Sequence, residues 1–179
     1  MKKILAFTGS NHSQSINQKL LDFATRNITL HDVTVLDLND YPLPLYSLDI
    51  EKEGIPEQVI ALKNIISEYD ALIIASPEHN GSMPSFLKNV IDWLSRLAKP
   101  KESFFGVTGM PVLLLSTSPG VNGGATNIKT MMELIPWWGG EVKGTFSLGN
   151  FYEVFTDGKF STETENMIKE AIIAFEDKL

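Results

Sequence analysis

The stretch Ile4-Leu-Ala-Phe-Thr-Gly-Ser-Asn-His-Ser-Gln-Ser-Ile-Asn17 decides how this chain folds, because an apolar run stops at Gly9 and a helical pattern begins directly after it. The pattern predicts a strand that leads through a polar loop into the N-terminus of a helix. Such a helix start has unpaired backbone N–H groups and the positive end of the helix dipole, and both favour an anion such as phosphate. The loop contains no Lys or Arg. Its hydroxyl and amide side chains are those of Thr8, Ser10, Asn11, Ser13, Ser15 and Asn17.

Two interpretations of this loop remain open from the residues alone. Ser15 is a good N-cap, so the stretch is also explained by a strand, a glycine turn and an ordinary helix start. The loop matches neither G-x-G-x-x-G nor G-x-x-x-x-G-K-[ST], which disfavours a dinucleotide fingerprint and an ATP-binding loop. Its one titratable side chain is His12, so neutral hydrogen bonds would hold most of any bound anion.

The composition predicts one acidic globular domain that spans residues 1–179. Hydrophobic residues make up 43% and charged residues 21% of the chain, which is long enough to bury a core of its own. The formal charge of -7 argues against binding to nucleic acid or to an anionic membrane. The chain has no cysteine, which excludes disulfides and thiolate chemistry and fits a cytoplasmic location. No apolar run approaches the length of a membrane span.

Apolar runs alternate with amphipathic helical patterns along the chain. Near-continuous apolar runs such as Ala71–Ala75 indicate strands that are covered on both faces, as in parallel sheets. Five strands alternating with five helices predict an α/β fold: a doubly wound five-stranded parallel sheet, order 2-1-3-4-5, with helices on both faces. The predicted strands are Lys3–Thr8, 33–38, Ala71–Ala75, 111–116 and 141–146.

Several helix boundaries are predicted from their end signals. Pro84 is expected at the first helical position, ahead of an apolar stripe. A helix over 125–135 should end at Pro136, and a capping-box pattern over 162–165 should begin the last helix. The Pro-rich stretch 39–54 is predicted to be a long loop, with a functional role and simple surface covering weighed equally.

Three polar loops are predicted to meet at one edge of this sheet. Ligands of such sheets lie at the carboxyl ends of the strands, near the switch between the first and third strands. The loops that follow those ends are 9–17, 76–82 and 117–124. Each glycine taken singly is explained by a turn. Three glycine-containing loops together suit a flat ligand whose polar edge is approached by backbone N–H groups.

Other chemistries are disfavoured by what these loops lack. A phospho-accepting response regulator would have acidic residues at its strand ends, where this chain has Thr8-Gly9 and Ala75-Ser76. The hydrolase elbow G-x-S-x-G is absent. No metal site is predicted, because the spacing of the three histidines, His12, His31 and His79, does not suggest one.

Over most of the chain, roughly Lys3 to Phe146, the sequence resembles the NADPH-dependent FMN reductases, a family on a flavodoxin-like fold that includes quinone, azo-dye and chromate reductases. The likeness rests on Gly9-Ser10 with Ser15 and Asn17, and on Pro77-Glu-His-Asn-Gly-Ser-Met-Pro84 continued by Leu87-Lys-Asn-Val-Ile-Asp-Trp93. It implies bound FMN, NADPH or NADH as electron donor, and a small acceptor such as a quinone, azo compound, chromate or free flavin. It also implies a homodimer or homotetramer.

The resemblance also implies which residues bind the cofactor. Ser10, Ser15 and Asn17 would bind the FMN phosphate, while 77–82 and 118–124 would border the isoalloxazine ring. The chain departs from the family at His12, where Arg is frequent, and at His79, where Tyr is frequent. The full predicted set is Gly9, Ser10, His12, Ser15, Ile16, Asn17, Pro77, Glu78, His79, Asn80, Gly81, Ser82, Ser118, Pro119, Gly120, Gly123 and Gly124.

The predicted mechanism is a two-electron reduction in which the flavin carries the chemistry and no side chain acts as acid or base. Backbone donors near Gly123 and Gly124, at a helix N-terminus, would stabilise the anionic reduced ring. The alternative is a flavodoxin-like electron-transfer module that serves a protein partner, which an acidic surface would suit. A flavin-binding sensor has no direct support. Candidates for the nicotinamide or acceptor pocket, or for a subunit interface, are 43–46, Arg96 and the Trp137-Trp138 pair.

Overall fold

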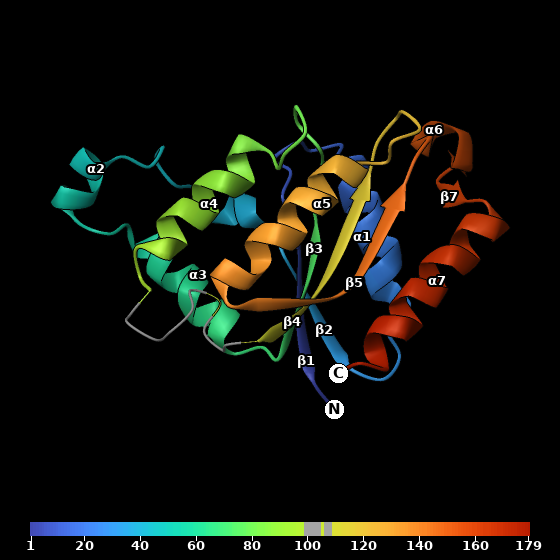
Figure 1. Cartoon of the computed structure of the whole chain (residues 1–179), viewed down its shortest axis with the longest axis horizontal. Helices are drawn as coiled ribbons and strands as arrows, with labels where there is room; N and C mark the ends of the chain where they lie inside the picture. The colour runs from blue at the N-terminus through green and yellow to red at the C-terminus, as the bar shows by residue number, and fades with distance from the viewer. Residues whose placement is uncertain (99–104, 106–108) are drawn as a thin grey trace.

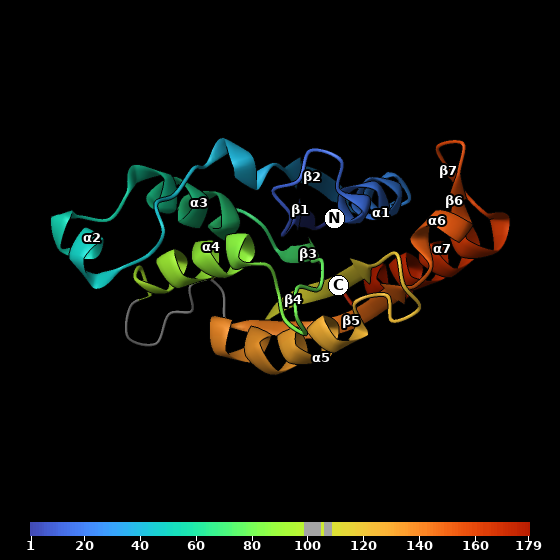
Figure 2. The same ribbon diagram turned by 90° about the horizontal axis from the view of Figure 1, so that it is seen from above.

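A parallel sheet runs through the middle of the molecule and separates two layers of helices (Figures 1 and 2). The computed structural model describes residues 1–98, 105 and 109–179. These residues form a five-stranded sheet in the order β2-β1-β3-β4-β5, with every neighbouring pair parallel. The predicted fold class and strand order are therefore confirmed. The strands are β1 (Lys3–Thr8), β2 (Asp32–Leu36), β3 (Ala71–Ala75), β4 (Met110–Thr117) and β5 (Gly140–Leu148).

The helices divide between the two faces of the sheet. One face carries α1 (Ile16–Arg26) and α7 (Thr162–Glu176). The other carries α3 (Glu57–Ser67), α4 (Ser85–Ser95) and α5 (Ala125–Leu134), as Figure 2 shows. The shorter elements are η1 (Leu38–Asp40), α2 (Leu48–Glu53), η2 (Ile135–Trp138), α6 (Phe151–Val154), β6 (Phe155–Thr156) and β7 (Lys159–Phe160).

The central strand β3 shows why the sheet is covered on both sides. Successive side chains of a strand point to opposite faces, so an uninterrupted apolar run needs two apolar layers. Leu72 and Ile74 pack into the core beneath α3, α4 and α5, whereas Ile73 packs into the core beneath α1 and α7. Each of these side chains is at most 1% exposed, and such burial is worth roughly 1.5–3 kcal/mol per residue.

The prediction of a long loop over 39–54 is wrong for the second half of that stretch, which contains the helix α2. Ser47 accepts a hydrogen bond from the backbone N–H of Ile50 at 3.2 Å and caps the short helix α2. The strand predicted over 33–38 is also too long. Asp37 accepts from the backbone N–H of Asn39 at 2.9 Å and turns the chain into η1. In both places a local side-chain cap decides the structure.

Other boundaries differ by small shifts. Pro84 is the N-cap of α4 and not its first helical residue. The helix predicted to Ile135 ends at Leu134 and continues as the 3-10 turn η2, with Pro136 inside it. The last helix is capped by Ser161, which accepts from the backbone N–H of Thr164 at 3.3 Å, so the cap lies one residue before the predicted one.

The β6–β7 hairpin was missed because strands of two residues show no alternation. Its turn has the Asp-Gly sequence that favours this geometry, with φ of 50° at Asp157 and 78° at Gly158. The hairpin and α6 stand beside the N-terminal half of α1 and precede α7 (Figure 1). In the described ranges, no helix combines the length and apolar character that crossing a bilayer would require.

Two neighbouring isoleucines of α7 test this fold, since Ile172 is the residue tested and Ile173 is its matched control. Ile172 is fully buried against the sheet, whereas Ile173 is 55% exposed. We expect Ile172→Ala to lower the free energy of unfolding by ~2–5 kcal/mol, because it leaves a cavity. Ile173→Ala should change it by less than about 0.5 kcal/mol. Urea denaturation followed by circular dichroism measures both, and equal losses would contradict this packing of α7.

Candidate active site

The three predicted loops meet at the carboxyl ends of β1, β3 and β4, where they line a pocket of about 280 Å³. The geometry therefore brings together residues that lie more than a hundred positions apart in the chain. Ten of the predicted residues line this pocket: Ser10, His12, Ser15, Ile16, Asn17, Pro77, Glu78, His79, Ser118 and Pro119. The other predicted residues belong to the same loops but do not line it: Gly9, Asn80, Gly81, Ser82, Gly120, Gly123 and Gly124.

The first loop presents unpaired donors at the start of α1. Ser15 caps the helix by accepting from the backbone N–H of Gln18 at 3.3 Å, and Ser10 accepts from the backbone N–H of His12 at 3.2 Å. Neither hydroxyl donates a hydrogen bond within the described part of the chain. The backbone N–H groups of Ile16 and Asn17 also have no acceptor there. This group of neutral donors lies at the positive end of the α1 dipole and suits an anion.

The side chain of Asn17 is already used inside the protein. Its Nδ2 donates to the Thr117 carbonyl and its Oδ1 accepts from the Thr117 N–H, both at 3.0 Å. The residue is 2% exposed, so this pair is protected from water. The group of Asn17 that remains to bind an anion is its backbone N–H.

The second loop contains a tight turn that fixes His79 at the pocket wall. His79 and Ser82 exchange backbone hydrogen bonds at 2.8 and 3.2 Å. The two central residues are left-handed, with φ of 54° at Asn80 and 82° at Gly81, as in a type I′ turn. Gly81 has space for a Cβ atom, so its role is to permit this backbone conformation.

Glu78 places a negative charge at the N-terminus of α5. Its carboxylate accepts from the backbone N–H of Asn127 at 3.1 Å and from the side chain of Asn122 at 3.2 Å. A carboxylate at this position is stabilised by the helix dipole. The positive end of α5 is therefore already balanced by the protein, which weakens the predicted role of this helix in stabilising a reduced ring.

Gly123 and Gly124 are required by contacts inside the protein. A Cβ atom on Gly124 would lie 1.9 Å from the Ser116 hydroxyl, and one on Gly123 would lie 2.6 Å from the Ser147 hydroxyl. Both distances are far shorter than a van der Waals contact. These glycines therefore let the third loop pack against β4 and β5, whereas the sequence suggested that they let a ligand approach.

Asn127 is a site residue that the sequence analysis missed. It is fully buried, and its Nδ2 contacts the Ser76 hydroxyl and the Pro77 carbonyl, each at 2.9 Å. These bonds tie the second loop to α5. One signal in the sequence could have identified it. Asn127 lies on the buried face of α5 with Ile128 and Met131, and a helix normally carries an apolar residue at such a position. Three residues that were not predicted also line the pocket. They are Gln14 of the first loop, Thr117 at the end of β4, and Tyr152 of α6, a helix that was not predicted.

The loop over 43–46 and Arg96 form a separate cluster. The Tyr46 hydroxyl donates to Glu51 at 2.8 Å, and the Arg96 guanidinium donates to the same carboxylate at 3.0 Å. Both bonds, that of Tyr46 most strongly, lower the pKa of Glu51 below its ordinary value. Arg96 therefore fastens α2 to α4, and these residues do not line the pocket. Trp138 is buried, whereas Trp137 is 83% exposed.

The pocket suits a ligand with an anionic group at one end and a polar, flat part at the other. The unpaired donors of α1 fit a terminal phosphate, and the walls formed by the second and third loops fit a ring. This donor set is compatible with FMN. Across the described ranges, no group of three or more His, Asp or Glu side chains is arranged to hold a metal ion.

Comparisons with known proteins point to the same cofactor. A sequence profile of the NADPH-dependent FMN reductase family matches residues 2–153. A quinone reductase of Escherichia coli K12 is 46% identical over 84 residues, which are 46% of this chain and 42% of that protein. An NAD(P)H-dependent FMN reductase of Pseudomonas aeruginosa is 36% identical over 124 residues, which are 66% of this chain and 60% of that protein. The matches thus span less than two thirds of either relative.

A solved structure extends the likeness to the whole chain. The flavoenzyme NAD(P)H:(acceptor) oxidoreductase FerB from Paracoccus denitrificans has a TM-score of 0.80 and 26% sequence identity. The comparison covers 99% of this chain and 96% of that one. The predicted reductase class and its cofactors FMN and NAD(P)H are confirmed at the level of the family. The chain belongs to the NADPH-dependent FMN reductase family, on the flavodoxin-like fold that its sequence predicts.

Proposed function

We propose that the protein binds FMN in the pocket between the three loops, takes two electrons from NADPH or NADH, and transfers them to a small acceptor. The acceptor classes are a quinone, an azo compound, chromate or free flavin. The observation that carries this proposal is the group of unpaired donors at the start of α1, beside a pocket lined by the family's second loop motif. The family match favours a reductase over an electron-transfer module.

The phosphate would bind to the start of α1. The hydroxyls of Ser10 and Ser15 and the backbone N–H groups of Ile16 and Asn17 would donate hydrogen bonds to its oxygens. Hydrogen bonds to a charged group are worth about 1.5–3 kcal/mol each, so neutral donors suffice for tight binding. His12 also lines this pocket.

The ring would lie between the second and third loops. Pro77 and His79 of the second loop, Ser118 and Pro119 of the third, and Tyr152 of α6 line this part of the pocket. Bound FMN supplies the hydride and electron chemistry, so the protein's task is to hold the ring and exclude water. Because both loops are fixed by internal hydrogen bonds, little ordering is needed when the ring binds.

No side chain is needed as an acid or base. Glu78 is held by α5, and its carboxylate already accepts two hydrogen bonds. His79 is held by its turn as part of the wall. Hydride transfer depends on alignment of donor and acceptor, and solvent can supply the proton that follows. The arrangement therefore positions the reactants without general acid–base catalysis.

The predicted homodimer or homotetramer and the predicted cytoplasmic location remain parts of this proposal. The residues that we name as candidates for a subunit interface are Leu45, which is 78% exposed, and Trp137, which is 83% exposed.

Ser15 gives the most direct test of the phosphate site. We expect Ser15→Ala to weaken FMN binding about tenfold to a hundredfold, because one hydrogen bond to a charged group is lost. Calorimetric titration with FMN measures the change. Ser161→Ala is the matched control, because it removes the N-cap of α7 but lies outside the pocket. Loss of affinity in both variants, or in neither, would mean that Ser15 only caps its helix.

A second test concerns His79. If His79 is a wall, then His79→Tyr, the residue frequent in the family, should leave the rate of flavin reduction within about tenfold, a barrier change below ~1.4 kcal/mol. Anaerobic stopped-flow reduction of the FMN-saturated variant by NADPH or NADH, between pH 5 and 9, measures this rate. General acid–base catalysis by His79 would instead give a loss of about a hundredfold and remove any pH dependence of the rate that the parent protein shows.

A further inference from the structure

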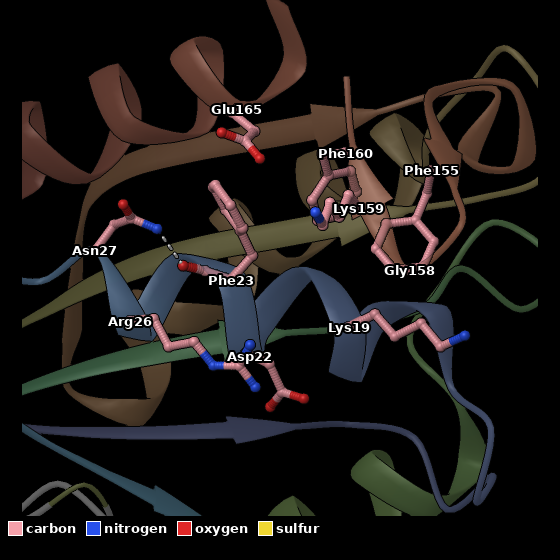
Figure 3. Close-up of a pocket in the computed structure, with 10 residues that line it drawn as sticks. All are labelled: Lys19, Asp22, Phe23, Arg26, Asn27, Phe155, Gly158, Lys159, Phe160 and Glu165. Atoms are coloured by element: carbon pink, nitrogen blue, oxygen red, sulfur yellow. Dashed lines mark hydrogen bonds between the residues drawn. The ribbon is translucent and has the colours of Figure 1, made fainter. Parts of the chain in front are cut away.

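A second and larger pocket lies on the α1 and α7 side of the molecule. It has a volume of about 670 Å³ and is formed by α1, the β6–β7 hairpin and the start of α7 (Figure 3). A volume of this size is typical of small-molecule sites. No residue lines both this pocket and the proposed FMN site. We refer to it as the hairpin pocket.

Three phenylalanine rings form the apolar part of the hairpin pocket. Phe23 of α1 meets Phe160 edge to face, with ring centroids 5.3 Å apart, and Phe155 lies 4.7 Å from Phe160. The fully buried Phe151 stacks on Phe155 at 4.9 Å and supports it from behind. Phe23 and Phe155 remain partly exposed to solvent. An ammonium group lies over each of these two rings, Lys19 over Phe155 at 5.3 Å and Lys169 over Phe23 at 5.8 Å, so a flat ligand ring would displace these cations from the aromatic faces.

The rim of the hairpin pocket carries cations that pair with no carboxylate in the described part of the chain. They are Lys19, Arg26 and Lys159. Of the two acidic residues that line the pocket, Glu165 pairs with Lys169 at 3.3 Å, whereas Asp22 accepts from the neutral amide of Gln18 at 2.8 Å and keeps its charge. The Lys19 ammonium lies 5.3 Å from the Phe155 ring centroid. Within the described ranges, the lining therefore carries three cations without a carboxylate partner against one carboxylate without a cation partner, Asp22, and this excess of positive charge favours an anion.

We propose that the hairpin pocket binds a small planar aromatic carboxylate. Its ring would lie against Phe155 and Phe23 in the offset or edge-to-face contacts that aromatic groups prefer. Its carboxylate would pair with Lys159 and Lys19 in charge-assisted hydrogen bonds. A neutral ring of the same shape would keep the apolar contacts but lose the charged ones. The ligand class follows from this combination of an aromatic floor and a cationic rim.

The test uses 2-naphthoate as the probe and the full chain labelled with ¹⁵N. We expect saturable shifts of the backbone amide signals of Gly158, Lys159 and Phe160 during the titration. The neutral analogue 2-naphthamide should bind at least about tenfold more weakly, as expected for loss of one charge-assisted contact. The double variant Lys19→Ala/Lys159→Ala should weaken 2-naphthoate by at least about the same factor.

Matched variants distinguish this site from general charge effects. Lys129→Ala removes an exposed cation from α5, on the other face of the sheet, and should leave the affinity for 2-naphthoate unchanged. Phe155→Leu keeps an apolar side chain but removes the ring, and should weaken 2-naphthoate binding. Equal affinity for the amide and the carboxylate would overturn the proposal. So would the absence of saturable shifts at the hairpin, or an equal loss in Lys129→Ala.

Discussion

The amide of Asn17 forms two hydrogen bonds with the backbone of Thr117, and the geometry of the site depends on this pair. The two residues are 100 positions apart, yet both bonds measure 3.0 Å and the amide is shielded from water. The pair joins the first turn of α1 to the carboxyl end of β4. As a result the unpaired N–H groups of α1 point into the same pocket that the third loop lines. Loss of one partner would leave the other buried and unsatisfied.

A second asparagine fixes the other side of the pocket in a similar way. Asn127, in the first turn of α5, holds the backbone of the second loop, while Glu78 of that loop accepts from the Asn127 N–H. Two helix starts are thus fastened to neighbouring strand ends by buried amides. This arrangement has an energetic cost, because the buried Oδ1 atom of Asn127 has no hydrogen-bond partner among the described residues. The gain is a pocket whose walls are formed before a ligand arrives.

The sequence predicted the sheet, its order and the three loops because these follow from local patterns. Apolar runs as continuous as β3 identify buried strands, and the glycine-containing loops must follow those strands. The roles of Asn17, Glu78 and Asn127 were not accessible, since their partners lie 44 to 100 positions away. The hairpin pocket was also missed, because β6 and β7 have two residues each and show no periodicity. Periodicity identifies long elements, whereas these site contacts depend on tertiary packing.

Neutral donors at the start of α1 are the groups that we propose bind the phosphate of FMN. Riboflavin has the same ring but lacks the phosphate, so the ratio of the two affinities isolates this contact. Calorimetric titration of the flavin-free protein with each ligand measures that ratio. We expect FMN to bind at least about a hundredfold more tightly than riboflavin, a difference of ~2.7 kcal/mol. Equal dissociation constants for FMN and riboflavin would contradict it.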